Sequence, residues 1–244
     1  MKRNALSLVV LETLMLLFSA CSGNVNNSGG TGSPGVQMMD DEEKVSFTSA
    51  DRKAFGLKGD VKECKGNPFG DITFDEKGRL VQVEGITVKY DADADDAGEL
   101  YFGPVLFTKF SKGVNEEYFK RNAEGLITVL LADPAWFAFE YDGQGFCSKV
   151  QLGDGQMITH GYQGVDENGN PATCKFGCVD DMGENVADWV YEYTKFDDKG
   201  NWIEREKTVT KDSYTSWETQ EVAVSTPNVT HVETREITYF QRGS

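Results

Sequence analysis

The feature that most constrains this chain is a short turn phrase, clearest at residues 196–202, where the sequence reads Phe-Asp-Asp-Lys-Gly-Asn-Trp. Asp197 stands at the first turn position, where its side chain can accept a hydrogen bond from the backbone N–H two residues on. Gly200 stands at the fourth position, where a positive φ has no steric cost. Such a turn joins two antiparallel strands, so the phrase predicts a β-hairpin.

Variants of the phrase recur along the chain, with turn glycines spaced about 20 to 30 residues apart, which is enough for two strands and two turns. The glycines are Gly78, Gly98, Gly125, Gly145, Gly169 and Gly200. Segments between them alternate in the manner of strands, as in Ile86-Thr87-Val88-Lys89-Tyr90. We therefore predict an all-β fold, an antiparallel meander of hairpins in a rolled or partly closed sheet. A short helical turn capped by Ser49 is expected before it.

The turn phrase, complete at residues 74–80, resembles the YD repeat of RHS-type bacterial proteins. The chain is most similar to the small YD-repeat-like lipoproteins of Gram-negative bacteria. Residues 57–62 resemble the opening of those proteins, and residues 200–205 and 234–239 resemble their close. The resemblance implies a β-meander over roughly residues 55–240 and supplies no catalytic residues. Six irregular repeats without an appended toxin domain cannot form the closed shell of the large RHS proteins.

The amino terminus has the pattern of a secretory signal. Lys2 and Arg3 precede a short apolar run over residues 5–18, and Ser19-Ala20-Cys21 follows. Small residues directly before a cysteine resemble the lipobox of bacterial lipoproteins, which implies cleavage after residue 20 and lipidation of Cys21. The alternative is an ordinary signal peptide with a chance cysteine. The residue after Cys21 is serine, which resembles the class sorted to the outer membrane, with the periplasmic or surface side left open.

The sequence therefore predicts three segments: a signal peptide over 1–20, a flexible tether over 21–45 rich in Gly, Ser and Asn, and one all-β domain over 46–244. The formal net charge is −16. A domain this acidic repels nucleic acid, so we exclude nucleic acid as a partner. We expect the protein to bind the membrane through the lipid anchor at Cys21.

Four cysteines follow Cys21. Because their number is even and the chain is exported, disulfides are expected, with three possible pairings. Gly177 would let Cys174 and Cys178 close on each other across a tight reversal, which leaves Cys64 to pair with Cys147. A zinc site on the C-x₃-C spacing is the alternative.

Two further patterns indicate ligands. Asp91, Asp93 and Asp95 stand at alternate positions and could converge oxygens on Ca²⁺, although the loop is not an EF-hand; the alternative is a solvated acidic turn. Trp189, Tyr191 and Tyr193 fall on one face of a strand, as do the aromatic residues at positions 137, 139 and 141. Such faces either stack on a ligand such as a sugar or pack into the core.

The sequence contains no Ser-His-Asp phrase, metalloprotease helix, phosphate loop or nucleophile elbow. We therefore predict no catalytic residue and no cofactor other than the candidate Ca²⁺. The expected function is a lipid-anchored binding or interaction module at the outer membrane or cell surface, with a glycan or a protein as its partner. The alternative is a carbohydrate-active enzyme or carbohydrate-binding protein that uses acidic and aromatic residues.

Overall fold

The computed structural model describes residues 46–241, apart from 93, 154–155 and 166–168. The predicted signal peptide, Cys21 and the predicted tether lie outside the described residues, so the lipid anchor stays a prediction. The described residues belong to one compact unit.

The predicted turn forms in the same way at four places, beginning at Asp75, Asn122, Asp142 and Asp197. In each turn the side-chain Oδ1 of the first residue accepts a hydrogen bond of 2.9 Å from the backbone N–H four residues on. In the last three turns this oxygen also accepts from the N–H two residues on, as predicted. The turn glycine donates its N–H to the first residue's carbonyl oxygen and has a positive φ. Each turn therefore satisfies its own backbone groups locally.

Gly98 does not form the predicted turn. It lies inside strand β5 (Ala94–Phe102) and pairs with Tyr90 of β4 (Ile86–Asp91). A Cβ at this position would lie 2.3 Å from the carbonyl oxygen of Lys89. Glycine is therefore needed here because two backbones approach closely, and not because the chain reverses.

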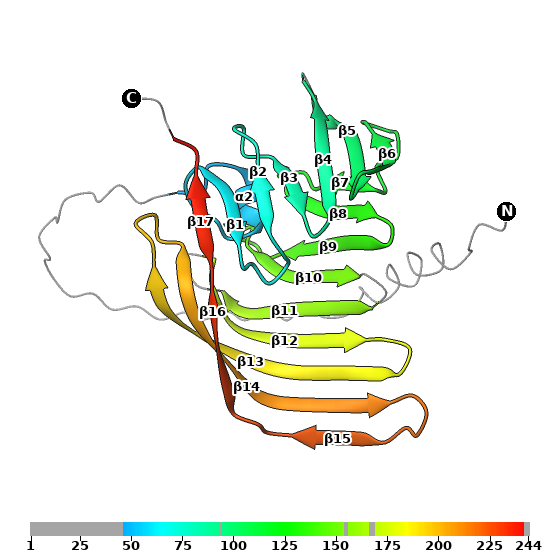
Figure 1. Cartoon of the computed structure of the whole chain (residues 1–244), viewed down its shortest axis with the longest axis vertical. Helices are drawn as coiled ribbons and strands as arrows, with labels where there is room; N and C mark the ends of the chain where they lie inside the picture. The colour runs from blue at the N-terminus through cyan, green and yellow to red at the C-terminus, as the bar shows by residue number, and fades with distance from the viewer. Residues whose placement is uncertain (1–45, 93, 154–155, 166–168, 242–244) are drawn as a thin grey trace, which may run out of the picture. The chain divides into compact units, whose positions relative to one another are not determined.

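The strands of the described residues form two antiparallel sheets, and neither closes into a barrel, so the predicted all-β meander is confirmed (Figure 1). The smaller sheet has the order β17 (Glu236–Tyr239), β1 (Val61–Lys65), β2 (Ile72–Phe74), β3 (Leu80–Val83), β4, β5 and β6 (Val105–Phe110). The larger sheet has the order β15 (Val222–Ser225), β14 (Trp202–Ser216), β13 (Gly183–Phe196), β12 (Pro171–Val179), β11 (Met157–Val165), β10 (Cys147–Gly153), β9 (Ala135–Tyr141), β8 (Ile127–Ala132) and β7 (Phe119–Arg121).

The last two strands connect the sheets. Strand β16 (Val229–Thr234) pairs with β14 of the larger sheet, on the edge that β15 also uses. The chain then crosses to the smaller sheet, where β17 pairs with β1. The last strand of the described chain therefore lies beside the first, a long-range pairing that the hairpin pattern did not predict.

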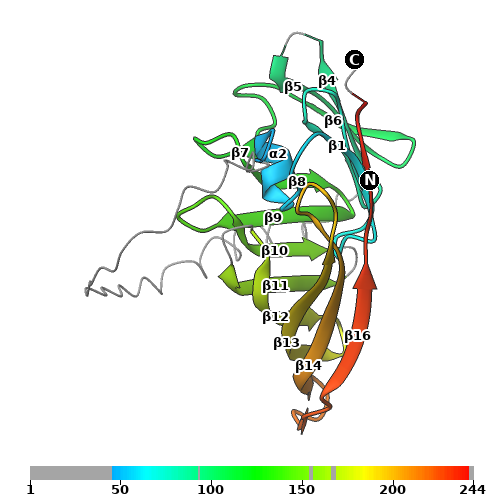
Figure 2. The ribbon, with the colours of Figure 1, turned by 90° about the vertical axis from the view of Figure 1, so that its left-hand side faces the viewer.

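Helix α2 (Ala50–Ala54) is the predicted helical turn, and Ser49 caps it by accepting a hydrogen bond from the backbone N–H of Arg52. The segment around this helix is bonded to three of the four turns. Ser49 Oγ donates to the carbonyl oxygen of Gly78 at 2.7 Å, and Lys53 Nζ donates to that of Gln144 at 2.5 Å. The backbone N–H of Lys58 donates to Asn201 Oδ1 at 2.7 Å. Figure 2 shows α2 among the strand ends on this side.

Two charged residues of α2 are buried and fully engaged. Asp51 accepts a hydrogen bond of 2.7 Å from the backbone N–H of Leu80 and forms a double interaction with the guanidinium of Arg121. Arg52 donates from Nε to the carbonyl oxygen of Val61 at 2.9 Å. These bonds fix the beginning of the described chain to both sheets, because Leu80 and Val61 belong to the smaller sheet and Arg121 to the larger one.

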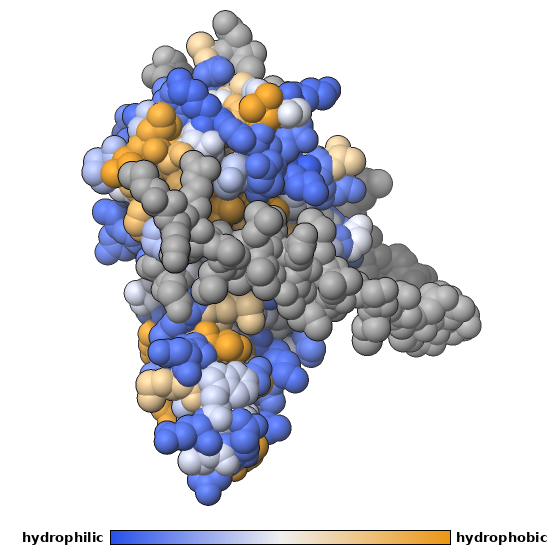
Figure 3. Space-filling model, turned by 90° about the vertical axis from the view of Figure 1, so that its right-hand side faces the viewer, coloured by the Kyte–Doolittle hydropathy of each residue, from blue (hydrophilic) through white to orange (hydrophobic). Residues whose placement is uncertain are grey.

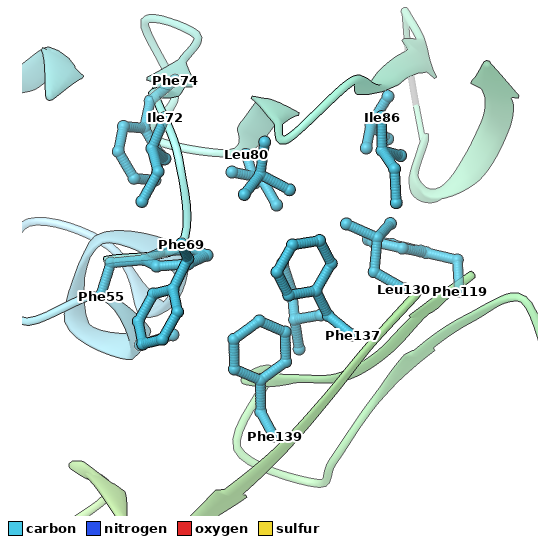
Figure 4. Close-up of a cluster of buried hydrophobic side chains, with 14 of the residues drawn as sticks. Phe55, Phe69, Ile72, Phe74, Leu80, Ile86, Phe119, Leu130, Phe137 and Phe139 are labelled. Atoms are coloured by element: carbon cyan, nitrogen blue, oxygen red, sulfur yellow. The ribbon is translucent and has the colours of Figure 1, made fainter. Parts of the chain in front are cut away.

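The hydrophobic core lies between the smaller sheet and strands β7 to β10 of the larger one. Figure 4 shows the side chains of the two sheets pointing toward one another, with those of Leu80 and Ile86 on one side and Leu130 and Phe137 on the other. All four are at most 1% exposed. We call this region, strands β7 to β10 with the smaller sheet over them, the two-layer half.

Strands β11 to β16 continue the larger sheet past this core (Figure 1). Among the described residues, no side chain of β11 to β16 belongs to the buried core cluster, although Tyr162 packs against it. We call this region the single-layer half. Figure 3 shows the side of the molecule that lies on the right in Figure 1. The described surface on this side is largely hydrophilic, with several apolar patches. No helix in the described part of the chain has the length and apolar character to cross a membrane.

Candidate functional site

Aromatic side chains from three neighbouring strands of the single-layer half meet on one face. The register pairs His160 of β11 with Phe176 of β12, and Phe176 with Ala187 of β13, two residues before Trp189. The rings of Phe176 and Trp189 are stacked, with centroids 4.5 Å apart, and His160 lies 5.4 Å from Phe176. We call the residues His160, Phe176 and Trp189 the aromatic face. It is half-buried, apart from His160, which Phe69 of the β1–β2 loop covers.

The three predicted ligand residues of β13 differ in how accessible they are. Tyr191 is only 7% exposed and lies under the guanidinium of Arg205, whose central carbon is 3.9 Å from the ring centroid. Tyr193 is half-buried and donates from its hydroxyl to the carbonyl oxygen of Pro171 at 2.7 Å. Trp189 is half-buried, with Lys207 Nζ 4.4 Å from its ring centroid. Ligand binding stays a prediction, and Trp189 is the ring best placed for it.

Two arginines that the sequence analysis did not select lie next to these rings. The guanidinium groups of Arg205 and Arg235 both lie over the Trp202 ring, with their central carbons 4.4 Å and 3.5 Å from its centroid. Arg205 is 3% exposed and is paired with Glu233, whose Oε2 is 2.7 Å from its Nη2. The two arginines are far apart in sequence and meet because β16 pairs with β14, which no local pattern indicates.

Both arginines line a cavity of about 40 Å³ at the point where the two-layer and single-layer halves join. This volume is room for a few water molecules or a carboxylate-sized group. We call it the junction cavity. Its walls come from α2, the β1–β2 loop, the turns before β10 and β12, and strands β11 and β14, and they include Lys53, Phe55, Phe146, Trp202, Arg205 and Arg235.

Burial moves the titratable groups around these rings away from neutral pH. It lowers the pKa of His160 to about 4, and the nearby charges of Lys207 and Arg205 act in the same direction. It raises the pKa of the Cys174 thiol to about 12 and the pKa of the Tyr191 hydroxyl well above its usual range. These three groups therefore stay neutral near pH 7, where a general acid or base would need a pKa close to the working pH.

The cysteines correct one prediction. Cys174 and Cys178 both lie in the extended strand β12, so the tight reversal at Gly177 does not form. Four residues of extended chain separate their Cα atoms by about 13 Å, far beyond the reach of a disulfide. Cys64 and Cys147 are also free thiols, so the predicted Cys64–Cys147 pairing is wrong as well.

The metal predictions have different outcomes. Asp91 ends β4 and is exposed, whereas Asp93 and the side chain of Asp95 lie outside the described residues, so the calcium site stays a prediction. Cys174 Sγ lies 4.0 Å from His160 Nδ1, but the zinc alternative gains no third ligand there. Among the described residues, no three His, Cys, Asp or Glu side chains gather in a way that could hold a metal ion.

Comparison with known proteins gives no family for this chain. A scan against protein-family models finds no match, and a search of the curated proteins finds none. The similarity to YD-repeat-like lipoproteins therefore rests on the turn phrases, and it stays a prediction.

Proposed function

We propose that this protein is a lipid-anchored binding module of the outer membrane or cell surface, which holds its partner on the aromatic face without catalysing a reaction. The observation that carries the proposal is the position of this face. Phe176 and Trp189 lie half-buried on strands whose described side chains are not members of the buried core cluster. Rings placed outside the core bury further apolar area when a partner covers them.

The chemistry around the face also favours binding over catalysis. The groups that could transfer a proton are His160, Cys174 and Tyr191, and burial holds each of them in its neutral form near pH 7. What the face offers a partner at that pH is aromatic area beside the ammonium group of Lys207, which lies 4.4 Å from the Trp189 ring centroid and is paired with Glu233. Such groups bind by stacking and charge.

The beginning of the described domain supports the anchoring part of the proposal. Ser49, Lys53 and Lys58 bind three of the turns, and Asp51 and Arg52 are buried among both sheets. If Cys21 is lipidated, the chain enters the domain from the membrane at this segment. The hydrogen bonds and buried charges of the segment would then link the anchored chain to both sheets.

A glycan is the partner class that the stacked pair favours. The rings of Phe176 and Trp189 stack on each other, 16° apart in plane, and form an aromatic pair beside a cation. The apolar C–H face of a sugar packs on such rings. A protein partner with an exposed apolar side chain is the second class, and the two are separated by the experiment below.

The anchor is tested by fractionation of cells that make the wild type or Cys21→Ala. The wild type is expected in the membrane fraction and the variant in the soluble fraction. Retention of Cys21→Ala in the membrane fraction to the same extent as the wild type would contradict the anchor.

The binding face is tested by screening the Cys21→Ala chain against a glycan array and against envelope proteins, and then measuring affinity for each positive. Trp189→Ala is expected to weaken binding at least about tenfold, the effect of removing an aromatic contact at the centre of an interface. Trp217→Ala is the matched control, because Trp217 is 42% exposed and lies beyond β14, away from this face. Equal affinity of Trp189→Ala and wild type for every partner found would overturn the proposed face.

A further inference from the structure

Three buried side-chain polar atoms in the described part of the chain have no hydrogen-bond partner, and all three are donors. They are Asn67 Nδ2 and the Nε and Nη1 atoms of Arg235. Buried polar groups in folded proteins almost always have a partner. Because arginine has no acceptor atom and its charge persists at ordinary pH, the partner that the Nε and Nη1 atoms of Arg235 need is a hydrogen-bond acceptor.

The protein itself supplies little to meet this need. Burial raises the pKa of the neighbouring Cys64 thiol, while the adjacent Arg235 and the Asn67 side chain lower it without cancelling the effect of burial. The thiol therefore stays protonated near pH 7, and a neutral thiol is a weak acceptor. Glu233, on the same strand segment, is already held by Arg205 and by Lys207 at 2.5 Å.

The charged side chains among the described residues that line the junction cavity are all basic. Its described walls contain Lys53, Arg205 and Arg235 and no aspartate or glutamate. The whole chain has 40 acidic residues and only 24 basic ones, so this wall is the reverse of the average surface. Lys53 and Arg205 have partners of their own, at Gln144 and Glu233, whereas Arg235 forms no ion pair with a described residue. The Trp202 ring beneath Arg235 holds its guanidinium plane in place.

We propose that the junction cavity binds a small oxyanion, either free or as the carboxylate of a larger molecule, and that Arg235 is its principal ligand. Oxygens of the anion accept hydrogen bonds from the unpartnered donors of Arg235, and Arg205 and Lys53 add to the positive field. A charge-assisted bond of this kind is stronger than a hydrogen bond between neutral groups. The site lies beside the proposed aromatic face without sharing a residue with it: none of His160, Phe176 and Trp189 lines the cavity, although Phe69, which does, contacts His160.

The test uses the purified full-length chain, with sodium acetate and sodium phosphate as probes and sodium chloride added to keep the ionic strength constant. Tryptophan fluorescence and the thermal midpoint are followed as each probe rises to about 50 mM, because a ligand of the native state raises the midpoint in a saturable way. A response to acetate alone identifies a carboxylate site, and responses to both probes identify a general oxyanion site. No saturable response to either probe would show that water fills the cavity and would overturn the proposal.

Three variants assign the response to the cavity. Arg235→Gln is expected to abolish the saturable midpoint shift for both probes, and Arg235→Lys, which keeps the charge but loses the Nε donor, to weaken it about tenfold. Trp202→Phe is expected to lose most of the fluorescence change while keeping the midpoint shift. Lys195→Gln is the matched control, because Lys195 is 60% exposed and pairs with Glu204 on the surface; it should respond as the wild type does.

An unchanged response in Arg235→Gln would overturn the proposal. If that variant does not fold, an unchanged response in Arg235→Lys has the same force. Neither result bears on glycan or protein binding at Trp189, so the two proposals fail separately.

Discussion

The two halves of the larger sheet share one backbone pattern but differ in what covers them. In the two-layer half, Leu130 and Phe137 point into a core closed by the smaller sheet, and they are at most 1% exposed. In the single-layer half, the same face of the sheet continues with Phe176 and Trp189, which stay half-buried. Antiparallel hairpins extend a sheet without a second layer, because each strand satisfies the backbone of its neighbour. We infer that the repeated hairpin builds the sheet and that the covering smaller sheet provides most of the stability.

The largest effect should come from the two-layer core. Leu130→Ala is expected to lower the free energy of unfolding by about 2–5 kcal/mol, because it leaves a cavity where packing is complete. The control is Val190→Ala in the single-layer half, where Val190 is 43% exposed and the change should stay within about 0.5 kcal/mol. Urea denaturation of both variants measures the difference. Equal losses would show that the single-layer half carries as much of the stability as the core.

The single-layer half has one contact expected to matter as much as a core side chain. Glu233→Gln leaves the buried guanidinium of Arg205 without its carboxylate, and it should cost about 3 kcal/mol. Glu204→Gln, which breaks the surface pair with Lys195, should leave the denaturation midpoint unchanged. If Glu233→Gln lowers the free energy of unfolding no more than Glu204→Gln does, then water solvates the Arg205 guanidinium well enough to replace the carboxylate.

The pH dependence of stability tests the contribution of the buried His160 in the single-layer half. The folded pKa of His160, about 4, lies below the unfolded value near 6.5, so the unfolded state binds the proton first as pH falls. The stability that neutral His160 contributes is therefore complete above pH 6.5 and is lost as pH falls toward 4. The difference amounts to the order of 3 kcal/mol, from about 1.4 kcal/mol for each pH unit.

The measurement is the unfolding free energy from pH 7 to pH 5.5. This range ends above the loss expected from Glu233, whose pKa the adjacent arginine and lysine hold below its usual value and whose contribution begins to fall near the unfolded pKa of about 4.3. His160→Phe should flatten this dependence. His231→Phe, at the exposed second histidine, should leave it as in the wild type. A dependence that persists unchanged in His160→Phe would place the titrating group elsewhere.

The smallest effects should be alike in the two halves, because the turns are local. Gly125→Ala in the two-layer half and Gly200→Ala in the single-layer half both put a side chain at positive φ, with an expected cost of about 1–2 kcal/mol each. Gly143→Ala is the control, since its φ is not positive and its added Cβ would meet nothing within 4 Å. Thermal denaturation compares the three. A large difference between Gly125→Ala and Gly200→Ala would show that the turns depend on the layer above them.

The sequence predicted structure that depends on hydrogen bonds between nearby residues, and it did not predict structure that depends on contacts between distant residues. The four turns at Asp75, Asn122, Asp142 and Asp197 could be predicted because their hydrogen bonds close within five residues. Gly98 belongs to a variant of the phrase with inserted residues, and there the close approach of the Lys89 carbonyl oxygen decides the structure. Gly177 was interpreted as a reversal, yet its neighbours pair with β11 and β13, and a paired strand overrides a single glycine.

In the candidate sites, too, local patterns could be predicted and long-range contacts could not. Strand alternation predicted that Trp189, Tyr191 and Tyr193 share a face, but not that Arg205 covers Tyr191. The junction cavity could not be predicted at all, because Arg235 reaches it only through the pairing of β16 with β14 and of β17 with β1. Contacts between residues so far apart in sequence have no periodic signal.

Hydrogen exchange of the full chain tests the division between the halves most directly. Strands β8 and β9 in the two-layer half and β12 and β13 in the single-layer half all have a hydrogen-bonded neighbour on each side. Their ladders are therefore matched, and only the covering layer differs. We expect the central amides of β8 and β9 to exchange at least about tenfold more slowly than those of β12 and β13, because local opening costs less where fewer apolar contacts are lost. Equal rates, or slower exchange in β12 and β13, would contradict it.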